Sequence, residues 1–206
     1  MQKQKDNVMK KYFDFKFYAI NILPFFVLLL SLLWIKLFNV NAIYENSWYE
    51  NTAVIPLIVS IVMCLRAKKH KVLFNVIAMF LILAIAREFS YGRVPFAQIP
   101  GTHDYYSWSH YKYGYLAHIF VGIYIAWIAL YAIIKKIWLD IKNILIETTI
   151  PFWSFFFVLI AIGLQYYSER FLHYDIGEEV AEFVIYTFVF VITCIYMQKL
   201  KISAEK

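Results

Sequence analysis

Ionisable side chains lie inside or at the edge of long apolar runs at three places in this sequence. Arg87 and Glu88 lie near the end of one run, His118 lies near the start of another, and Glu182 lies within a third. A charge at membrane depth is costly unless it is paired or hydrated. A carboxyl group and an imidazole in such a place can exchange protons with a substrate. We therefore assign Glu182, His118 and Glu88 as the candidate catalytic acid–base residues.

The charged neighbours of these residues are candidates for substrate binding. Arg87 is the natural counter-ion of the carboxylates, and Arg87 or Arg93 would bind an anionic headgroup. Glu178, Glu179 and Glu182 are spaced so that the first and the third share one helix face. Glu178 and Glu179 equally fit the start of a helix, where the helix dipole favours acidic side chains. We predict a salt bridge, within ~4 Å, between Arg87 and one of the nearby carboxylates.

Candidate metal ligands are scattered. Glu169 and His173 have the i, i+4 spacing of a helical ligand pair, and His103 lies in the segment between the third and fourth apolar runs. These segments equally fit a solvated turn and an interfacial stretch rich in tyrosine and tryptophan. We predict no metal site, and the sequence specifies no cofactor.

Six apolar runs must position these groups. Of the 206 residues, 62% are hydrophobic and only 17% are charged, which excludes a chain that folds in water alone. The runs cover residues 17–40, 52–65, 72–91, 115–138, 150–167 and 177–197. Pro24 and Pro56 are expected to kink the first two. We predict an all-α fold, in which residues 1–206 form one integral membrane domain with six transmembrane helices.

The charges between the runs orient this bundle. Most of the 20 Lys and Arg residues precede the first run or follow the second, fourth and sixth runs. By the positive-inside rule these segments are cytoplasmic, and so are both termini. Most acidic residues lie on the other side. The net charge of +6 is therefore an orientation signal, and we expect no nucleic-acid partner.

Counting along the helices places four ionisable groups at one depth. At ~1.5 Å per residue, Arg87, Glu88, His118 and Glu182 all lie ~24–26 Å from the cytoplasmic basic residues. This depth is just beneath the outer boundary of a hydrocarbon core that is ~30 Å thick. We therefore predict an outward-facing pocket built from the third, fourth and sixth helices.

Two short patches resemble a known group of sequences. The segment REFSYGR, residues 87–93, resembles the REISWGR-type stretch of a family of small uncharacterised bacterial inner-membrane proteins, with Tyr91 where Trp is commoner. Members of that family end with an acidic EExxE helix, which residues 178–182 match. The resemblance implies a multi-pass protein of the bacterial inner membrane with a paired site at its outer face, and it implies no particular activity.

Three functions fit this arrangement. The first is an enzyme that acts on a lipid or lipid-linked headgroup in the outer leaflet, with a carboxylate as the acid or base. The second is a protein that binds or transports a solute, an ion or a proton through the same cavity. The third is a membrane subunit whose polar layer docks a partner. Membrane lipids and a small-molecule or lipid substrate are the expected ligands.

Overall fold

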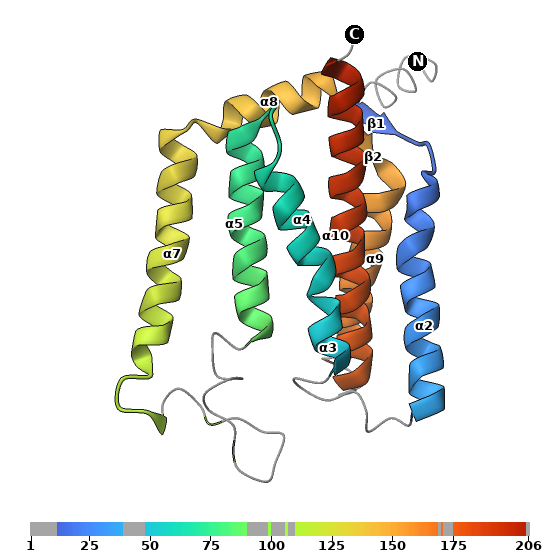
Figure 1. The fold of residues 1–206 in the computed structure, drawn as a ribbon, viewed down its shortest axis with the longest axis vertical. Coiled ribbons are helices and arrows are strands. Elements are labelled where there is room, and N and C mark those ends of the chain that lie inside the picture. The colour runs from blue at the N-terminus through green and yellow to red at the C-terminus, as the bar shows by residue number, and fades with distance from the viewer. Residues whose placement is uncertain are drawn as a thin grey trace.

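The computed structural model describes residues 12–38, 48–89, 99, 106, 110–168, 170 and 175–204, and these residues are mostly helical (Figure 1). The longer helices are α2 (Ile22–Phe38), α4 (Ile55–Leu65), α5 (Lys71–Glu88), α7 (Tyr115–Ile134), α9 (Phe152–Tyr167) and α10 (Asp175–Ala204). The other elements are β1 (Phe13–Asp14), the 3-10 helix η1 (Ala19–Asn21), α3 (Trp48–Ala53), α8 (Ile137–Glu147) and β2 (Ile150–Pro151). The predicted helical fold class is confirmed.

Three helical segments among the described residues are long and apolar enough to cross a membrane. They are Ala19–Leu37, Tyr115–Ile134 and Ile176–Lys201. Asn51–Leu65 and Phe152–Tyr167 are apolar but shorter. By length and composition, the three long segments are those of a membrane protein.

The fourth predicted run is wrong at its C-terminal end. α7 ends at Ile134, and the chain turns at Lys135 and Lys136, where Lys136 has a φ of 52°. A left-handed residue ends a helix, and lysine side chains favour the headgroup region over hydrocarbon. The residues after this turn form α8, which crosses the end of the bundle instead of continuing α7 (Figure 1).

Prolines lie where two helices begin. Pro56 is in the first turn of α4, and the helical path is interrupted at Val54, between α3 and α4 and two residues before Pro56. Pro24 lies in the first turn of α2. A proline in that position removes no intrahelical hydrogen bond, so Pro24 requires no kink there.

α10 is the central helix of the bundle. α9, α4, α3 and α2 pack around it, and α5 packs against α4 (Figure 1). The buried face of α10 includes Val184, Phe188, Val191 and Ile195. α7 packs against α5 and leaves most of its own surface exposed.

α8 holds the start of α5 in place. Oδ2 of Asp140 accepts hydrogen bonds from the amides of Val72 at 3.1 Å and Leu73 at 3.2 Å, and so caps α5 from outside that helix. Glu147 pairs with Lys69 at 3.3 Å and with His70 at 3.4 Å. Burial alone would raise the pKa of Glu147, but the hydrogen bond from Lys69 and the nearby His70 ring hold it below its ordinary value of 4.5.

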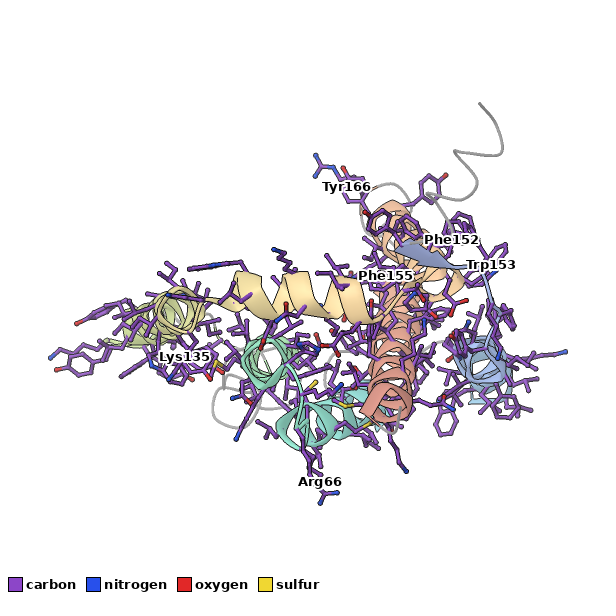
Figure 2. The ribbon with its side chains drawn as sticks, turned by 90° about the horizontal axis from the view of Figure 1, so that it is seen from above. Arg66, Lys135, Phe152, Trp153, Phe155 and Tyr166 are labelled. Carbon is purple, nitrogen blue, oxygen red and sulfur yellow. The ribbon has the colours of Figure 1, made fainter. Side chains whose placement is uncertain are left out.

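The two ends of the described chain meet at the same end of the bundle as α8. β1 pairs in parallel with β2, and Nζ of Lys199 lies 2.9 Å from Oδ2 of Asp14. Lys199 also donates to the carbonyl of Thr149 at 2.9 Å. Figure 2 views the molecule from this end and shows Trp153 beside β1, where its Nε1 donates to the carbonyl of Phe15 at 3.0 Å. We call these contacts of Asp14 and Lys199 the terminal clasp.

Candidate functional site

Predicted polar residues of α5 and α10 meet at the end of the bundle opposite the terminal clasp (Figure 1). Arg87 and Glu88 are the final residues of α5. Glu182 and Tyr186 lie four residues apart on α10 and therefore share one helix face. Gln165 reaches the same place from the last turn of α9. We call these five residues the Arg87 cluster.

A single guanidinium joins the two carboxylates of the cluster. Nη2 of Arg87 donates to Oε1 of Glu182 and, at 3.1 Å, to Oε1 of Glu88. Nε of Arg87 donates to the same Glu88 oxygen at 3.2 Å. The predicted salt bridge of Arg87 is therefore confirmed.

Two neutral side chains complete these contacts. The hydroxyl of Tyr186 donates to Oε1 of Glu88 at 2.5 Å, and Nε2 of Gln165 donates to Oε1 of Glu182 at 2.5 Å. Each Oε1 atom is thus hydrogen-bonded to the guanidinium and to a neutral donor. The cluster links α5, α9 and α10.

Burial differs sharply between the acids and the base of the cluster. The side chains of Glu88 and Glu182 are 5% and 7% exposed, whereas that of Arg87 is 53% exposed. Carboxylates that are removed from water need both a counter-charge and hydrogen bonds. The cluster supplies hydrogen bonds to both carboxylates, but it holds one cation for two acids.

One proton makes the cluster neutral. With both acids ionised, Glu88 and Glu182 would leave an uncompensated negative charge in a medium of low dielectric constant, which is unfavourable. Within the described residues, Oε2 of neither acid takes part in a hydrogen bond. The arrangement therefore sets two buried acidic side chains against one guanidinium.

Glu178 and Glu179 are two further acidic residues of α10, and they lie on different sides of that helix. Glu178 shares the face of Glu182 and repels its carboxylate. Glu179 acts electrostatically on Tyr49, whose hydroxyl donates to Oγ of Ser31 at 2.6 Å. Ser31 and Tyr49 line a separate cavity of about 380 Å³ between α2, α3 and α10. Of these two acids, Glu178 is thus the one beside the Arg87 cluster.

His118 is not part of the Arg87 cluster. Its side chain is exposed on α7, and none of the described contacts joins it to Arg87, Glu88 or Glu182. The cluster is therefore built from the third, fifth and sixth predicted helices, where the fourth was expected in place of the fifth. α7 packs against α5, whereas the cluster's other side chains come from α9 and α10, so equal depth does not bring His118 to the cluster (Figure 1).

Some predicted residues lie outside the described part of the chain. These are Arg93, His103, Glu169 and His173. Within the described residues, no group of three or more potential ligands is placed to hold a metal ion.

Sequence reasoning missed Gln165 and Tyr186. The position of Tyr186, four residues after Glu182, is a usable signal because it places a hydroxyl next to the carboxylate. Gln165 is the only amide side chain in α9, and an isolated polar side chain in an apolar helix commonly makes an interhelical hydrogen bond.

Comparison with known proteins identifies no relative. The chain matches no protein-family model, and searches of curated proteins and of solved structures find no match.

Proposed function

We propose that this chain is a multi-pass bacterial inner-membrane protein with six transmembrane helices and cytoplasmic termini. The segments containing α4, α5 and α9 then cross the membrane together with α2, α7 and α10. They lie alongside these helices in Figure 1, and each coincides with a predicted apolar run. An even number of crossings agrees with the terminal clasp, which holds Asp14 and Lys199 together. In this orientation the Arg87 cluster faces the outer leaflet.

We further propose that the Arg87 cluster is the acid–base centre of an enzyme that acts on a lipid or lipid-linked headgroup. The supporting observation is the pair of buried acids that share one guanidinium, because such a pair holds a transferable proton. Glu182 is the proton donor or acceptor in this proposal, and Glu88 holds Arg87 in position. Arg87 is half exposed and binds the anionic headgroup.

The replacement Glu182→Gln tests the enzyme proposal. It keeps the shape and hydrogen-bonding ability of the side chain but removes its charge and its exchangeable proton. We expect the variant to insert normally. Expression of the wild-type chain in a deletion strain should change the lipid headgroups, and expression of the variant should not. Mass spectrometry of whole-cell lipids measures the headgroups.

Glu147→Gln is the matched control, because Glu147 lies on α8 at the opposite end of the bundle. Glu147→Gln should give the same headgroup profile as the wild-type chain. The enzyme proposal is wrong if Glu182→Gln restores the same profile as the wild-type chain.

Proton-coupled transport is the second candidate, and the protonatable carboxyl pair favours it as well. In that case the wild-type chain leaves the headgroup profile unchanged. Proteoliposomes that contain a pH-sensitive dye would instead show proton movement, and Glu182→Gln would abolish it.

A further inference from the structure

An apolar cleft separates the outer halves of α5 and α7. Its volume is about 620 Å³, and its walls include Ile82, Leu83 and Ala86 of α5 and Ala117, Phe120 and Tyr124 of α7. Ala86 and Ala117 are small, so neither wall fills the space between the helices at their level. The lining offers almost no polar surface, and an occupant must therefore be apolar where it lies inside the cleft.

The cleft ends near the middle of the bundle. The hydroxyl of Tyr124 donates to the carbonyl of Met79 at 3.2 Å, and Nδ2 of Asn75 donates to the hydroxyl of Tyr131 at 3.2 Å. These contacts join α5 and α7 on the cytoplasmic side of the cleft. From Met79 to Arg87 is a rise of ~12 Å. The cleft is therefore about as deep as the hydrocarbon of one leaflet, which is half of ~30 Å.

Positive charges flank the outer end of the cleft. Arg87 directly follows the lining residue Ala86 on α5, and Lys112 directly precedes the lining residue Tyr113, with Nζ 5.4 Å from the centre of the tyrosine ring. Within the described residues, the hydrogen bonds of Arg87 use Nε and Nη2, which leaves Nη1 for a ligand. Lys112 adds a second positive charge at this end of the cleft.

We propose that the α5–α7 cleft binds one acyl chain of an anionic phospholipid, whose phosphate lies between Lys112 and Nη1 of Arg87. An acyl chain matches the apolar walls and the depth of one leaflet, and a phosphate matches the two cationic side chains. This inference rests on the proposed function, since it names the lipid class of the same site. The phosphate is then held beside Glu182 without contacting its buried carboxyl group.

Filling the cleft tests the binding of the acyl chain. The full-length protein in detergent is titrated with phosphatidylglycerol, and bound lipid is counted by native mass spectrometry. Ala117→Trp should weaken the tightest binding by about tenfold or more, which is ~1.4 kcal/mol. Ala126→Trp is the matched control, because Ala126 is exposed on the opposite face of α7, and its affinity should stay within about twofold of wild type.

A second filling variant guards against misfolding. Should Ala117→Trp fail to fold, Ala86→Leu fills the cleft from the α5 wall and should also weaken binding. Wild-type affinity in a folded cleft-filling variant would overturn the proposal.

The headgroup is tested separately. Lys112→Gln should weaken phosphatidylglycerol binding by about fivefold and leave the binding of phosphatidylcholine, which carries no net charge, nearly unchanged. Lys135→Gln, at the C-terminal end of α7, should change the affinity for neither lipid. Equal affinity of the wild-type chain for the two lipids would overturn the assignment of an anionic headgroup.

These outcomes are distinguishable from those of the enzyme proposal. A headgroup change that depends on Glu182, together with equal affinity for the two lipids, would remove the cleft proposal alone. Selective lipid binding without any headgroup change would remove the enzyme proposal and leave the cleft as a lipid site.

Discussion

Arg87 has an unusual set of partners for a single residue at the end of a helix. It pairs with an acid beside it in sequence and with another on a separate helix, and both acids are almost fully buried. Leaving a buried carboxylate without its cation costs more free energy than the ion pair contributes, because the carboxylate charge stays in a region that excludes water. Removing the arginine alone should therefore do more harm than removing the arginine and one acid together.

We predict that Arg87→Gln destabilises the fold by about 2–3 kcal/mol. This is below the ~3–5 kcal/mol of a fully buried pair, because Arg87 is half exposed. The double variant Arg87→Gln with Glu182→Gln should recover part of that loss. Thermal unfolding in detergent measures both.

Arg66→Gln is the control for this prediction. Arg66 points away from the bundle at the end of α4 (Figure 2), so its replacement should change stability by no more than ~0.5 kcal/mol. Equal melting temperatures for Arg87→Gln and Arg66→Gln would show that the Arg87 cluster contributes nothing to stability.

At the scale of elements, the terminal clasp joins β1 to the end of α10. Burial of Asp14 would raise its pKa, but the hydrogen bond from the Tyr18 hydroxyl and the nearby Lys199 ammonium outweigh burial. The pKa of Asp14 is therefore held below its ordinary value of 3.8. A carboxyl group with a lowered pKa in the folded state stabilises that state where the group is ionised, above its ordinary pKa. The stabilisation is lost as the pH falls through the lowered pKa.

We predict that Asp14→Asn lowers stability by roughly 1 kcal/mol between pH 5 and 7. This difference from wild type should begin to shrink as the pH falls below about 3.8 and should vanish below the lowered pKa of Asp14. Melting temperatures of both proteins across this pH range measure it. Lys199→Gln should show a similar loss at neutral pH. Lys201→Gln, which changes an exposed lysine two residues further along α10, should not. A difference between Asp14→Asn and wild type that is the same at every pH would contradict the role given to the ionised carboxylate.

At the scale of the whole molecule, the level of a side chain along the bundle could be predicted from the sequence. The direction in which that side chain points around its helix axis could not. The rise per residue is constant, so counting places Arg87 and Glu182 at one level, and they meet. His118 lies at the same counted depth on α7, but depth does not specify which helices are neighbours. Gln165 was missed because nothing in α9 marks the direction of its side chain.

The turn before α8 was missed for a different reason. Ile137, Trp138 and Leu139 continue the apolar run of α7, so hydrophobicity alone extends the helix through them. What ends α7 is the left-handed backbone at Lys136, which composition does not reveal. Asp140 then turns α8 toward the start of α5, a tertiary contact between distant parts of the chain.

The topology of the whole chain is tested by cysteine labelling in a variant that lacks Cys64 and Cys194. We predict that a membrane-impermeant maleimide labels Lys112→Cys in intact cells and labels Lys142→Cys only after the cells are permeabilised. Both positions are exposed in the structure, so access to the reagent depends on the side of the membrane. Labelling of Lys142→Cys in intact cells would reverse the proposed orientation.

The distance in sequence between Arg87 and Glu182 has a consequence for biosynthesis. Arg87 and Glu182 are 95 residues apart, so at ~5–20 residues per second the ribosome makes Glu182 on the order of 5–20 s after Arg87. If α5 crosses the membrane as proposed, it is inserted before α10 exists. Glu88, one residue away, is then the carboxylate that can neutralise Arg87 until Glu182 is made.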